Sequence, residues 1–218
     1  MSFQAQTLGY GPFRAVRNLI GALVIGAGPT MAEPVVVAAL GDSLTQGYGL
    51  PAEEGLVPQL QAWLDAEGVE ARLINAGVSG DTTAGGLARV DWTLTEEVDR
   101  LIVALGGNDM LRGLGPDEAR ANLAGILDAA EARGVEVLLV GLEAPGNYGA
   151  GYREAFAAAY SELAEAEGAL LLPDIFSPLR DLPPGEVMQA DMVHPNAEGV
   201  ALIVETLGPL VVQLIEGG

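Results

Sequence analysis

The chain has 218 residues, of which 50% are hydrophobic and 18% are charged, so it is long enough for one folded domain and too apolar for a disordered segment. Its formal net charge of −20 argues against nucleic acid as a partner and disfavours contact with anionic lipid headgroups. Cysteine is absent, which excludes a disulfide, a cysteine nucleophile and a thiolate metal site.

The N-terminal segment has the pattern of a secretory signal peptide. Arginines precede a short apolar run from Leu19 to Ala27, and threonine and alanine stand at positions −3 and −1 of a cleavage site before Glu33. The run is too short and too rich in glycine for a membrane-spanning helix, so stable membrane insertion is not expected. We expect residues 1–32 to be a signal peptide and residues 33–218 a periplasmic or secreted domain. The alternative is an uncleaved extension or N-terminal anchor.

Beyond Pro34, short apolar runs alternate with longer amphipathic stretches. An apolar run that ends at glycine suits a strand buried on both faces, and a stretch with proline or acids at its start and glycine after its end suits a helix. The elements expected on these grounds are, in chain order, strand Val35–Leu40, helix Gly55–Glu67, strand Val69–Asn75, helix Thr82–Leu94, strand Asp99–Leu105, helix Pro116–Arg133, strand Val135–Gly141, helix Tyr152–Glu167, strand Ala169–Leu172 and a last helix from Asn196 to about Ile215. The proline-rich segment 173–190 is expected to be a loop, with short helical turns at most.

The alternation of strands and helices predicts an α/β fold in which a five-stranded parallel sheet carries helices on both faces. Ligands of such sheets bind beyond the carboxyl ends of the strands. Small and polar residues cluster after every expected strand, at Gly41–Ser43, Gly77–Asp81, Gly106–Asp109, Asn147–Tyr148 and Asp191–His194. The sequence therefore predicts one site, assembled from distant segments at a single edge of the sheet.

His194 is the only histidine of the chain, and histidine is the side chain best suited to act as a base near neutral pH. Asp191 lies three residues before it, close enough to bind the far ring nitrogen and fix the tautomer. Taken alone, a single histidine is more often a surface or capping residue. The carboxylate, and a serine on the turn after the first strand, favour a catalytic role.

Ser43 follows that strand in Gly41-Asp42-Ser43-Leu44-Thr45, where glycine lets the backbone turn sharply. A serine hydroxyl becomes a useful nucleophile when a base takes its proton. A nucleophile elbow would read Gly-x-Ser-x-Gly and lie in the middle of the chain, so the α/β-hydrolase fold is rejected. The alternative reading is that Ser43 caps a following helix.

Acyl transfer also requires hydrogen-bond donors aimed at the developing oxyanion. Gly80 can offer an unobstructed backbone N–H, Asn108 a side-chain amide and Ser43 its own N–H. Gly80 and Asn108 could each be ordinary turn residues. Their arrangement in chain order, on the same edge as Ser43 and His194, favours an oxyanion hole.

These segments resemble the four sequence blocks of the SGNH (GDSL) hydrolases. The matching segments are Gly41–Thr45, Gly80, Gly106–Asp109 and Asp191–Pro195. The resemblance runs from about residue 34 to the C-terminus and is greatest to the bacterial branch of multifunctional acyl-CoA thioesterase I, protease I and lysophospholipase L1, also known as arylesterases. Asn75–Gly86 and Gly146–Gly149 are similar to segments of that branch.

The resemblance implies a role for each matched residue. Ser43 is implied to be the nucleophile, His194 the base and Asp191 the residue that orients the base. The Ser43 N–H, the Gly80 N–H and the Asn108 side chain are implied to form the oxyanion hole.

The resemblance also implies a flavodoxin-like three-layer α/β/α sandwich, the SGNH hydrolase fold, with no metal and no cofactor. The implied substrates are small carboxylic esters or thioesters, such as aryl esters, acyl thioesters or lysophospholipids, an acyl lipid among them. Asn147 and Tyr148 are candidate substrate-binding residues. Basic residues are frequent in this loop of the family, whereas Arg153 is the only one here, which argues against a preference for anionic carriers such as CoA.

Two other functions are compatible with the pattern. A carbohydrate O-acetylesterase would share the catalytic residues and differ in its pocket; Leu111, Leu114, Leu142 and Met192 slightly favour an acyl chain, although they could be core residues. A non-catalytic flavodoxin-like module that binds a nucleotide or flavin would share the order of elements, but no phosphate-binding glycine motif follows the first strand.

Overall fold

Five parallel strands form the sheet at the centre of the fold, in the spatial order β2-β1-β3-β4-β5. The computed structural model describes residues 1–2, 4, 33–144 and 146–217; the predicted signal peptide lies almost entirely outside them. The strands are β1 (Val35–Gly41), β2 (Ala71–Gly77), β3 (Arg100–Ala104), β4 (Glu136–Val140) and β5 (Leu170–Leu172). This order is that of a flavodoxin-like doubly wound sheet, so the predicted α/β fold with five parallel strands is confirmed.

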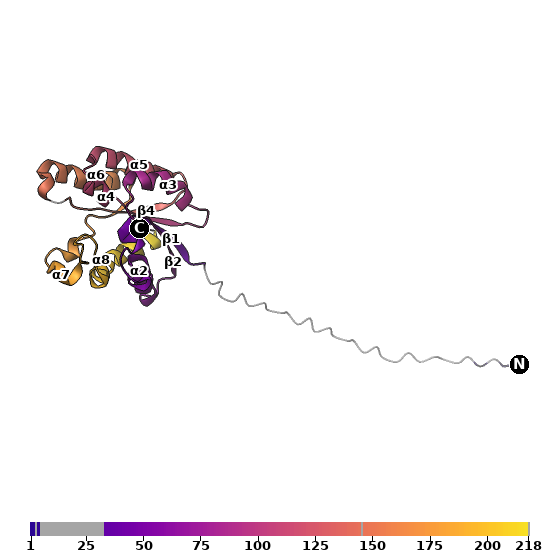
Figure 1. The fold of residues 1–218 in the computed structure, drawn as a ribbon. Helices are drawn as coiled ribbons and strands as arrows, with labels where there is room; N and C mark the ends of the chain where they lie inside the picture. Colours follow the sequence, from indigo (N-terminus) through magenta and orange to yellow (C-terminus); the bar gives the residue numbers. More distant parts are fainter. Residues whose placement is uncertain (3, 5–32, 145, 218) are drawn as a thin grey trace. The chain divides into compact units, whose positions relative to one another are not determined.

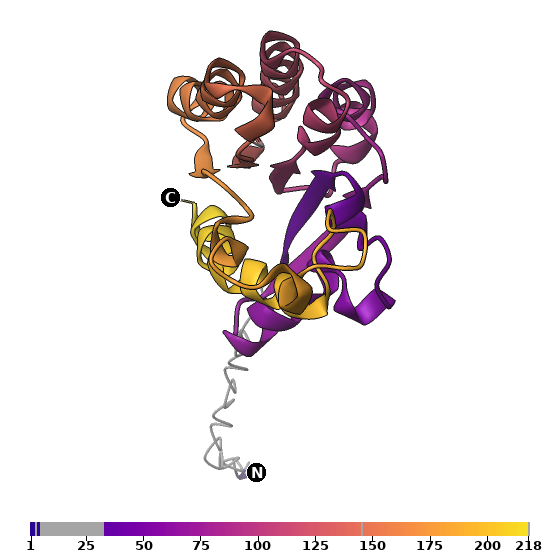
Figure 2. The same cartoon turned by 60° about the vertical axis from the view of Figure 1, so that its left-hand side comes forward.

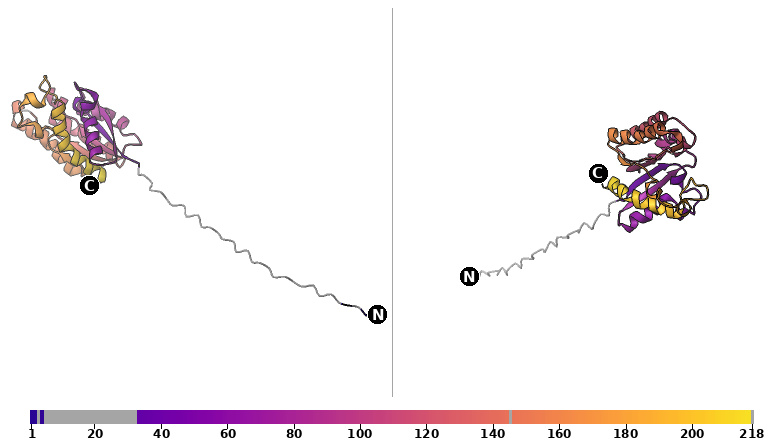
Figure 3. Two further views of the ribbon diagram at one scale, coloured as in Figure 1. Left: turned by 90° about the horizontal axis from the view of Figure 1, so that it is seen from below. Right: turned by 90° about the vertical axis from the view of Figure 1, so that its left-hand side faces the viewer.

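Helices cover both faces of the sheet (Figures 1 and 2). The long ones are α2 (Leu56–Ala66), α3 (Thr83–Thr93), α5 (Pro116–Glu131), α6 (Ala150–Glu167) and α8 (Ala197–Glu216). The short ones are α1 (Ser43–Gln46), α4 (Gly107–Leu111) and α7 (Pro184–Val187), with 3₁₀ turns η1 (Ala52–Glu54), η2 (Gly146–Tyr148) and η3 (Ser177–Leu179). Helices α3, α5 and α6 lie on one face and α2 and α8 on the other, which makes three layers (Figure 3).

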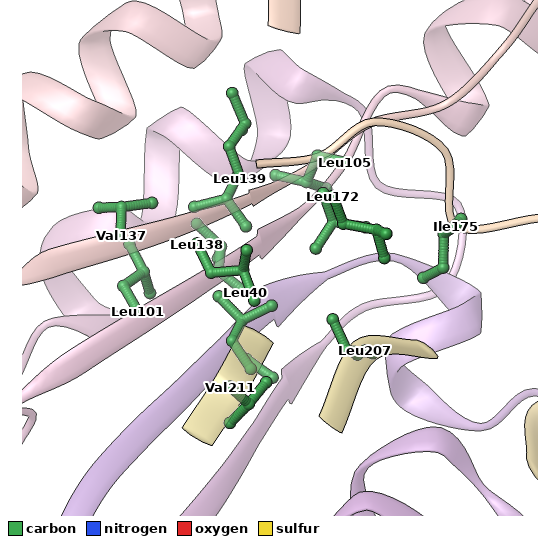
Figure 4. Close-up of a cluster of buried hydrophobic side chains, with 14 of the residues drawn as sticks. Leu40, Leu101, Leu105, Val137, Leu138, Leu139, Leu172, Ile175, Leu207 and Val211 are labelled. Carbon is green, nitrogen blue, oxygen red and sulfur yellow. The ribbon is translucent and has the colours of Figure 1, made fainter. Parts of the chain in front are cut away.

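The core lies between these layers. Leu40 of β1, Leu101 of β3 and Leu138 of β4 have no exposed surface, because the apolar runs of the central strands are covered on both sides. Leu207 and Val211 of α8 belong to the same cluster (Figure 4). Each fully buried side chain of this size stabilises the fold by roughly 1.5–3 kcal/mol.

Helix α8 is, by length and composition, the one helix of the described residues that could cross a membrane. Its apolar residues recur at helical spacing, and those facing inward are buried, among them Ile203, Leu207 and Val211. Gly208 lies directly against the ring of Trp63 on α2, where a Cβ atom would come within 2.6 Å of the ring. The burial of this face accounts for the apolar character of the helix.

Strand β2 starts later than the sequence predicts, because its first expected residue is hydrogen-bonded to a helix and not to a neighbouring strand. Strand β2 begins at Ala71 and not at Val69, because the N–H of Val69 donates to the carbonyl of Leu64 and closes the end of α2. The short helices α1 and α4 are not among the elements expected from the sequence. Both follow strands directly, and together they carry Ser43 and Asn108.

Candidate active site

The predicted site lies at the carboxyl edge of the sheet, where a cavity of about 470 Å³ opens to solvent. Its walls come from the segments that follow all five strands, as the strand order predicts. Ser43, Gly80, Asn108 and His194 all line this cavity. Segments that are up to 151 residues apart in the chain therefore meet at one place.

Ser43 is the first residue of α1, at the point where β1 ends. The helix cap is Asp42, whose side-chain Oδ1 atom accepts a hydrogen bond of 3.1 Å from the N–H of Leu44. Ser43 is therefore not the cap, and its hydroxyl is free for another partner. A Cβ atom on Gly77 would lie 2.3 Å from the backbone nitrogen of Gln46, so glycine at this position lets α1 pack directly on the end of β2.

Ser43, His194 and Asp191 are joined by hydrogen bonds in sequence. The Oγ atom of Ser43 lies 2.9 Å from Nε2 of His194, and Nδ1 of His194 lies 2.6 Å from Oδ2 of Asp191. The side chain of His194 is 19% exposed and that of Asp191 is 40% exposed, so the arrangement lies in the surface and can be reached from the cavity. In this geometry the hydroxyl can lose its proton to Nε2 while the carboxylate stabilises the imidazolium that forms.

Asp191 is held as a carboxylate by its surroundings. The hydrogen bond from His194 is the main cause, and the backbone N–H groups of His194 and Val193, each 3.0 Å from Oδ1, add to it. These bonds favour the charged form and lower the pKa of Asp191 to about 2. Asp191 therefore remains ionised over the whole range in which histidine titrates.

The loop that carries His194 is fixed by Gln189, a residue that the sequence analysis did not single out. The backbone N–H of Gln189 donates to the carbonyl of His194 at 2.8 Å. Its side-chain amide donates to the carbonyls of Pro195 at 3.0 Å and Tyr48 at 2.9 Å. The ring of Tyr48 packs on the imidazole with 4.7 Å between centroids. Gln189 thus joins the histidine loop to the segment after α1.

The Gly80 N–H is the free donor of its loop. The backbone N–H groups of Val78, Ser79 and Asp81 donate to Gly41, to the side chain of Gln46 and to Val78, respectively. Among the described residues, the Gly80 N–H has no acceptor. Gly80 has a φ of 80°, which glycine adopts without strain. An unpaired N–H on the wall of a cavity is suited to bind a developing oxyanion.

The side-chain amide of Asn108 also faces the cavity, from the first turn of α4. Its Nδ2 atom donates to Oδ2 of Asp42 at 3.2 Å, which leaves the second amide hydrogen for a ligand. Burial raises the pKa of Asp42, and hydrogen bonds from Leu44 and Asn108 and the charge of His194 act against this rise. Asp42 therefore both caps α1 and orients Asn108.

Asp109, the residue after Asn108, binds the start of α3. It is 1% exposed, and its two oxygens accept hydrogen bonds from the N–H of Thr83 at 2.9 Å and from the Thr83 hydroxyl at 2.6 Å. These bonds tie α4 to the start of α3. Asp109 is not hydrogen-bonded to Asn108 and is a structural residue of the site.

Arg89 of α3 links the strand ends beneath the site, and sequence reasoning did not find it. Its guanidinium donates to the carbonyls of Gly41 at 2.8 Å and Ala76 at 2.7 Å, and to the carboxylate of Asp81 at 2.6 Å. Gly41 precedes the turn of Ser43, and Asp81 follows Gly80. One partly buried guanidinium therefore fixes the spacing between the nucleophile turn and the oxyanion loop.

Apolar side chains form most of the remaining wall. Leu111, Leu142, Met192 and Tyr148 line the cavity, as the sequence analysis expected for an acyl-binding pocket. Leu114 and Asn147 are not among the described residues that line the cavity. The carbonyl of Leu114 instead accepts a hydrogen bond from the hydroxyl of Tyr152.

Candidate metal ligands lie elsewhere. In the described ranges, the one group of three acids whose oxygens come within 4.8 Å of one another is Asp128, Glu131 and Glu167. All three are exposed and none lines the cavity. The donors at the predicted site are a hydroxyl, an imidazole, amides and backbone N–H groups, a set suited to acyl transfer by a serine nucleophile.

Comparison with known proteins supports this reading. Residues 39–202 match the model of the GDSL-like lipase/acylhydrolase family. The chain is 39% identical to esterase TesA of Pseudomonas aeruginosa over 89% of its own length and 95% of the relative's. It is 37% identical to thioesterase 1/protease 1/lysophospholipase L1 of Escherichia coli over 76% of its own length and 78% of the relative's. The crystal structure of AlinE4, an SGNH-hydrolase family esterase, superposes with a TM-score of 0.71 at 44% identity, covering 84% of this chain and 98% of that one.

Proposed function

This chain belongs to the GDSL-like lipase/acylhydrolase family, and from that premise we propose that Ser43, His194 and Asp191 are its catalytic triad. The chain is a serine hydrolase that acts on ester bonds. The observation that carries the triad assignment is the hydrogen-bonded sequence from Oγ of Ser43 through the imidazole to Asp191, with distances of 2.9 and 2.6 Å. Membership of the family also sets aside the non-catalytic nucleotide-binding module.

In the acylation step, Oγ of Ser43 attacks the carbonyl carbon of the substrate while Nε2 of His194 takes the hydroxyl proton. The carbonyl oxygen becomes an oxyanion, which the N–H groups of Ser43 and Gly80 and the amide of Asn108 stabilise. The tetrahedral intermediate then collapses. The bond to the leaving alcohol or thiol breaks, the leaving group receives the proton from His194, and the acyl group remains on Ser43 as an ester.

In the deacylation step, a water molecule repeats the attack. His194 takes a proton from the water, the oxyanion forms again in the same hole, and the bond to Ser43 Oγ breaks. The proton returns from His194 to Oγ, and the carboxylic acid leaves. The carboxylate of Asp191 holds the imidazole in the tautomer that both steps require.

We propose small acyl esters and thioesters as the substrates. The apolar wall formed by Leu111, Leu142 and Tyr148 supports an acyl group with several carbons, because a purely acetyl-binding site would have no use for it. A carbohydrate O-acetylesterase would use the same triad. Initial rates on p-nitrophenyl esters of increasing chain length, compared with acetate release from acetylated xylan, separate the two.

The test of the mechanism is the Ser43→Ala variant. It should hydrolyse p-nitrophenyl esters roughly 10⁶-fold more slowly than the wild type, as in other triad enzymes, and a fluorophosphonate probe should label the wild type alone. A Ser43→Ala variant that retains more than a tenth of the wild-type kcat, in a folded state by circular dichroism, would disprove the assignment.

We further propose that residues 1–32 direct the enzyme to the periplasm or the medium. The support is the signal pattern of the sequence and the start of the compact unit at Glu33. Expression of the full chain in a Gram-negative host, followed by mass spectrometry of the periplasmic protein, should give an N-terminus at Glu33. Recovery of the intact N-terminus from the cytoplasm only would reject the proposal.

A further inference from the structure

Met192 has an unusual backbone for its residue type. Within the described part of the chain it is the one residue other than glycine in the left-handed region, with a φ of 59°. There the Cβ atom of an L-residue crowds the backbone, so any side chain costs conformational free energy that glycine does not. The turn requires this conformation, because the N–H of Met192 donates to Gln189 while the next two N–H groups donate to Asp191.

Packing within the protein does not offset this strain. The side chain of Met192 is 58% exposed, although methionine is a residue type that is usually buried. A glycine would make the same turn with less strain and would leave no apolar group in water. Strained residues that gain nothing from their own fold mark functional sites, where a ligand provides the missing contact.

The surroundings of Met192 indicate what kind of ligand this is. Nine large hydrophobic side chains are exposed in the described residues, and five of them line the one cavity that holds Ser43. The five are Tyr48, Leu111, Tyr148, Met192 and Val193. An exposed apolar patch of this kind around a cavity indicates an apolar ligand group.

We propose that Met192 is a specificity-determining residue that contacts the acyl chain of the substrate and favours acyl groups of medium length over acetyl. The proposal rests on the function proposed above, since the chain in question is attached to the carbonyl that Ser43 attacks. An acetyl group ends one carbon beyond this carbonyl, whereas an octanoyl group can extend along the apolar wall. The unbranched thioether of methionine adapts to a flexible chain better than a branched side chain does.

The test compares p-nitrophenyl octanoate with p-nitrophenyl acetate as the ratio of their kcat/KM values. Met192→Gly removes both the side chain and the strain, and Met192→Asn removes the apolar contact with a residue that tolerates the left-handed region. Both should lower the octanoate-to-acetate ratio about tenfold, which corresponds to about 1.4 kcal/mol. Met192→Leu, which keeps an apolar group, should hold the ratio within threefold of the wild type.

Two further measurements distinguish specificity from structure. Met192→Gly should melt at the wild-type temperature or up to roughly 4 °C higher, because strain is relieved. Trp92→Ser serves as the matched control: Trp92 is 85% exposed on α3, does not line the cavity, and its loss should leave the ratio unchanged.

Two results would overturn the proposal. One is an octanoate-to-acetate ratio within twofold of the wild type in both Met192→Gly and Met192→Asn. The other is a parallel loss on both esters with a lower melting temperature, which would make Met192 a structural residue of the turn. Because the ratio is measured on active variants, failure of this proposal differs from failure of the triad, which Ser43→Ala tests separately.

Discussion

The Oδ2 atom of Asp42 accepts a hydrogen bond of 3.2 Å from Nδ2 of Asn108, although the two residues are 66 positions apart in the chain. The other oxygen of Asp42 caps the helix that begins with Ser43. One carboxylate therefore contacts both the turn of the proposed nucleophile and a proposed oxyanion donor. The position of the attacking atom is thereby coupled to that of the donor through the side chain of Asp42.

Replacement of Asp42 should therefore reduce turnover without unfolding the protein. In Asp42→Asn, the new amide cannot accept as strongly from Asn108, so the oxyanion donor is less well oriented. We expect kcat for p-nitrophenyl acetate to fall on the order of tenfold, with KM nearly unchanged, because the lost interaction acts in the transition state.

Asp109→Asn is the matched control for that measurement, since Asp109 binds Thr83 and not Asn108. Losing one charge-assisted hydrogen bond in a buried position costs about 1.5–3 kcal/mol. The melting temperature should fall by roughly 3–12 °C, with a smaller change in kcat than in Asp42→Asn. A reversed pattern, with Asp109→Asn the less active and the more stable of the two, would contradict the division of roles.

Removal of the donor itself should have a larger effect. Asn108→Ala should lower kcat on the order of 10²–10³-fold, because the amide stabilises the charge that develops on the carbonyl oxygen. Labelling by a fluorophosphonate should slow in parallel, since its attack by Ser43 also develops charge on an oxygen. Full activity in this variant would assign the third donor to another group.

The two acids of the site should affect stability in opposite directions with pH. The pKa of Asp191 is lowered to about 2, so the contribution of this carboxylate is present above its unfolded value of 3.8 and is lost as the pH falls towards 2. The pKa of Asp42 is raised by burial, so its contribution is present at low pH and is lost as the pH rises through the folded value.

Thermal melts of the wild type, Asp42→Asn and Asp191→Asn between pH 2 and pH 8 measure both effects. The advantage of the wild type over Asp191→Asn should shrink below about pH 4. As the pH rises, the melting temperature of the wild type should fall relative to that of Asp42→Asn. Parallel curves for all three proteins would rule out the assigned shifts.

Arg89 should be important for stability and for activity. Arg89→Gln leaves the carbonyls of Gly41 and Ala76 and the carboxylate of Asp81 without their shared donor, which should cost about 2–3 kcal/mol and lower the melting temperature by roughly 4–12 °C. The kcat should also fall, because the turn of Ser43 and the loop of Gly80 lose their fixed spacing.

A surface arginine gives the comparison for Arg89. Arg133 pairs with Asp91, whose side chain is 73% exposed, so Arg133→Gln should change the free energy of unfolding by less than about 1 kcal/mol and leave kcat as it is. Equal effects of the two substitutions would mean that the hydrogen bonds of Arg89 have no special role.

The sequence predicted the strands well because the pattern is local. Apolar runs such as those of β1 and β3 end at glycine, and their observed boundaries differ from the prediction by one residue. Strand β2 was placed two residues too early, since the backbone bond from Val69 to Leu64 arises from the folded end of α2. Short helices such as α1 and α4 depend on contacts outside their own sequence, and no local pattern revealed them.

The site was predictable to the extent that strand order brings segments together. The carboxyl ends of parallel strands share one edge, so the meeting of Ser43, Gly80 and His194 followed from their positions after strands. The hydrogen bonds of Asp109 to Thr83, of Gln189 to Tyr48 and of Arg89 to Gly41 could not be predicted, because each partner lies on another element that only the packed structure brings within reach. Asn147 does not line the cavity. Its role in substrate binding therefore stays a prediction.

His194, whose ring nitrogens are hydrogen-bonded to Asp191 and Ser43, is also the only histidine of the protein. In a proton NMR spectrum its ring hydrogens are therefore free of overlap with those of other histidines. A single resonance followed from acid to alkali would give the protonation curve of the proposed base directly, in the intact enzyme and in its acylated form. Such a reporter needs neither isotopic labelling of one site nor the removal of competing histidines.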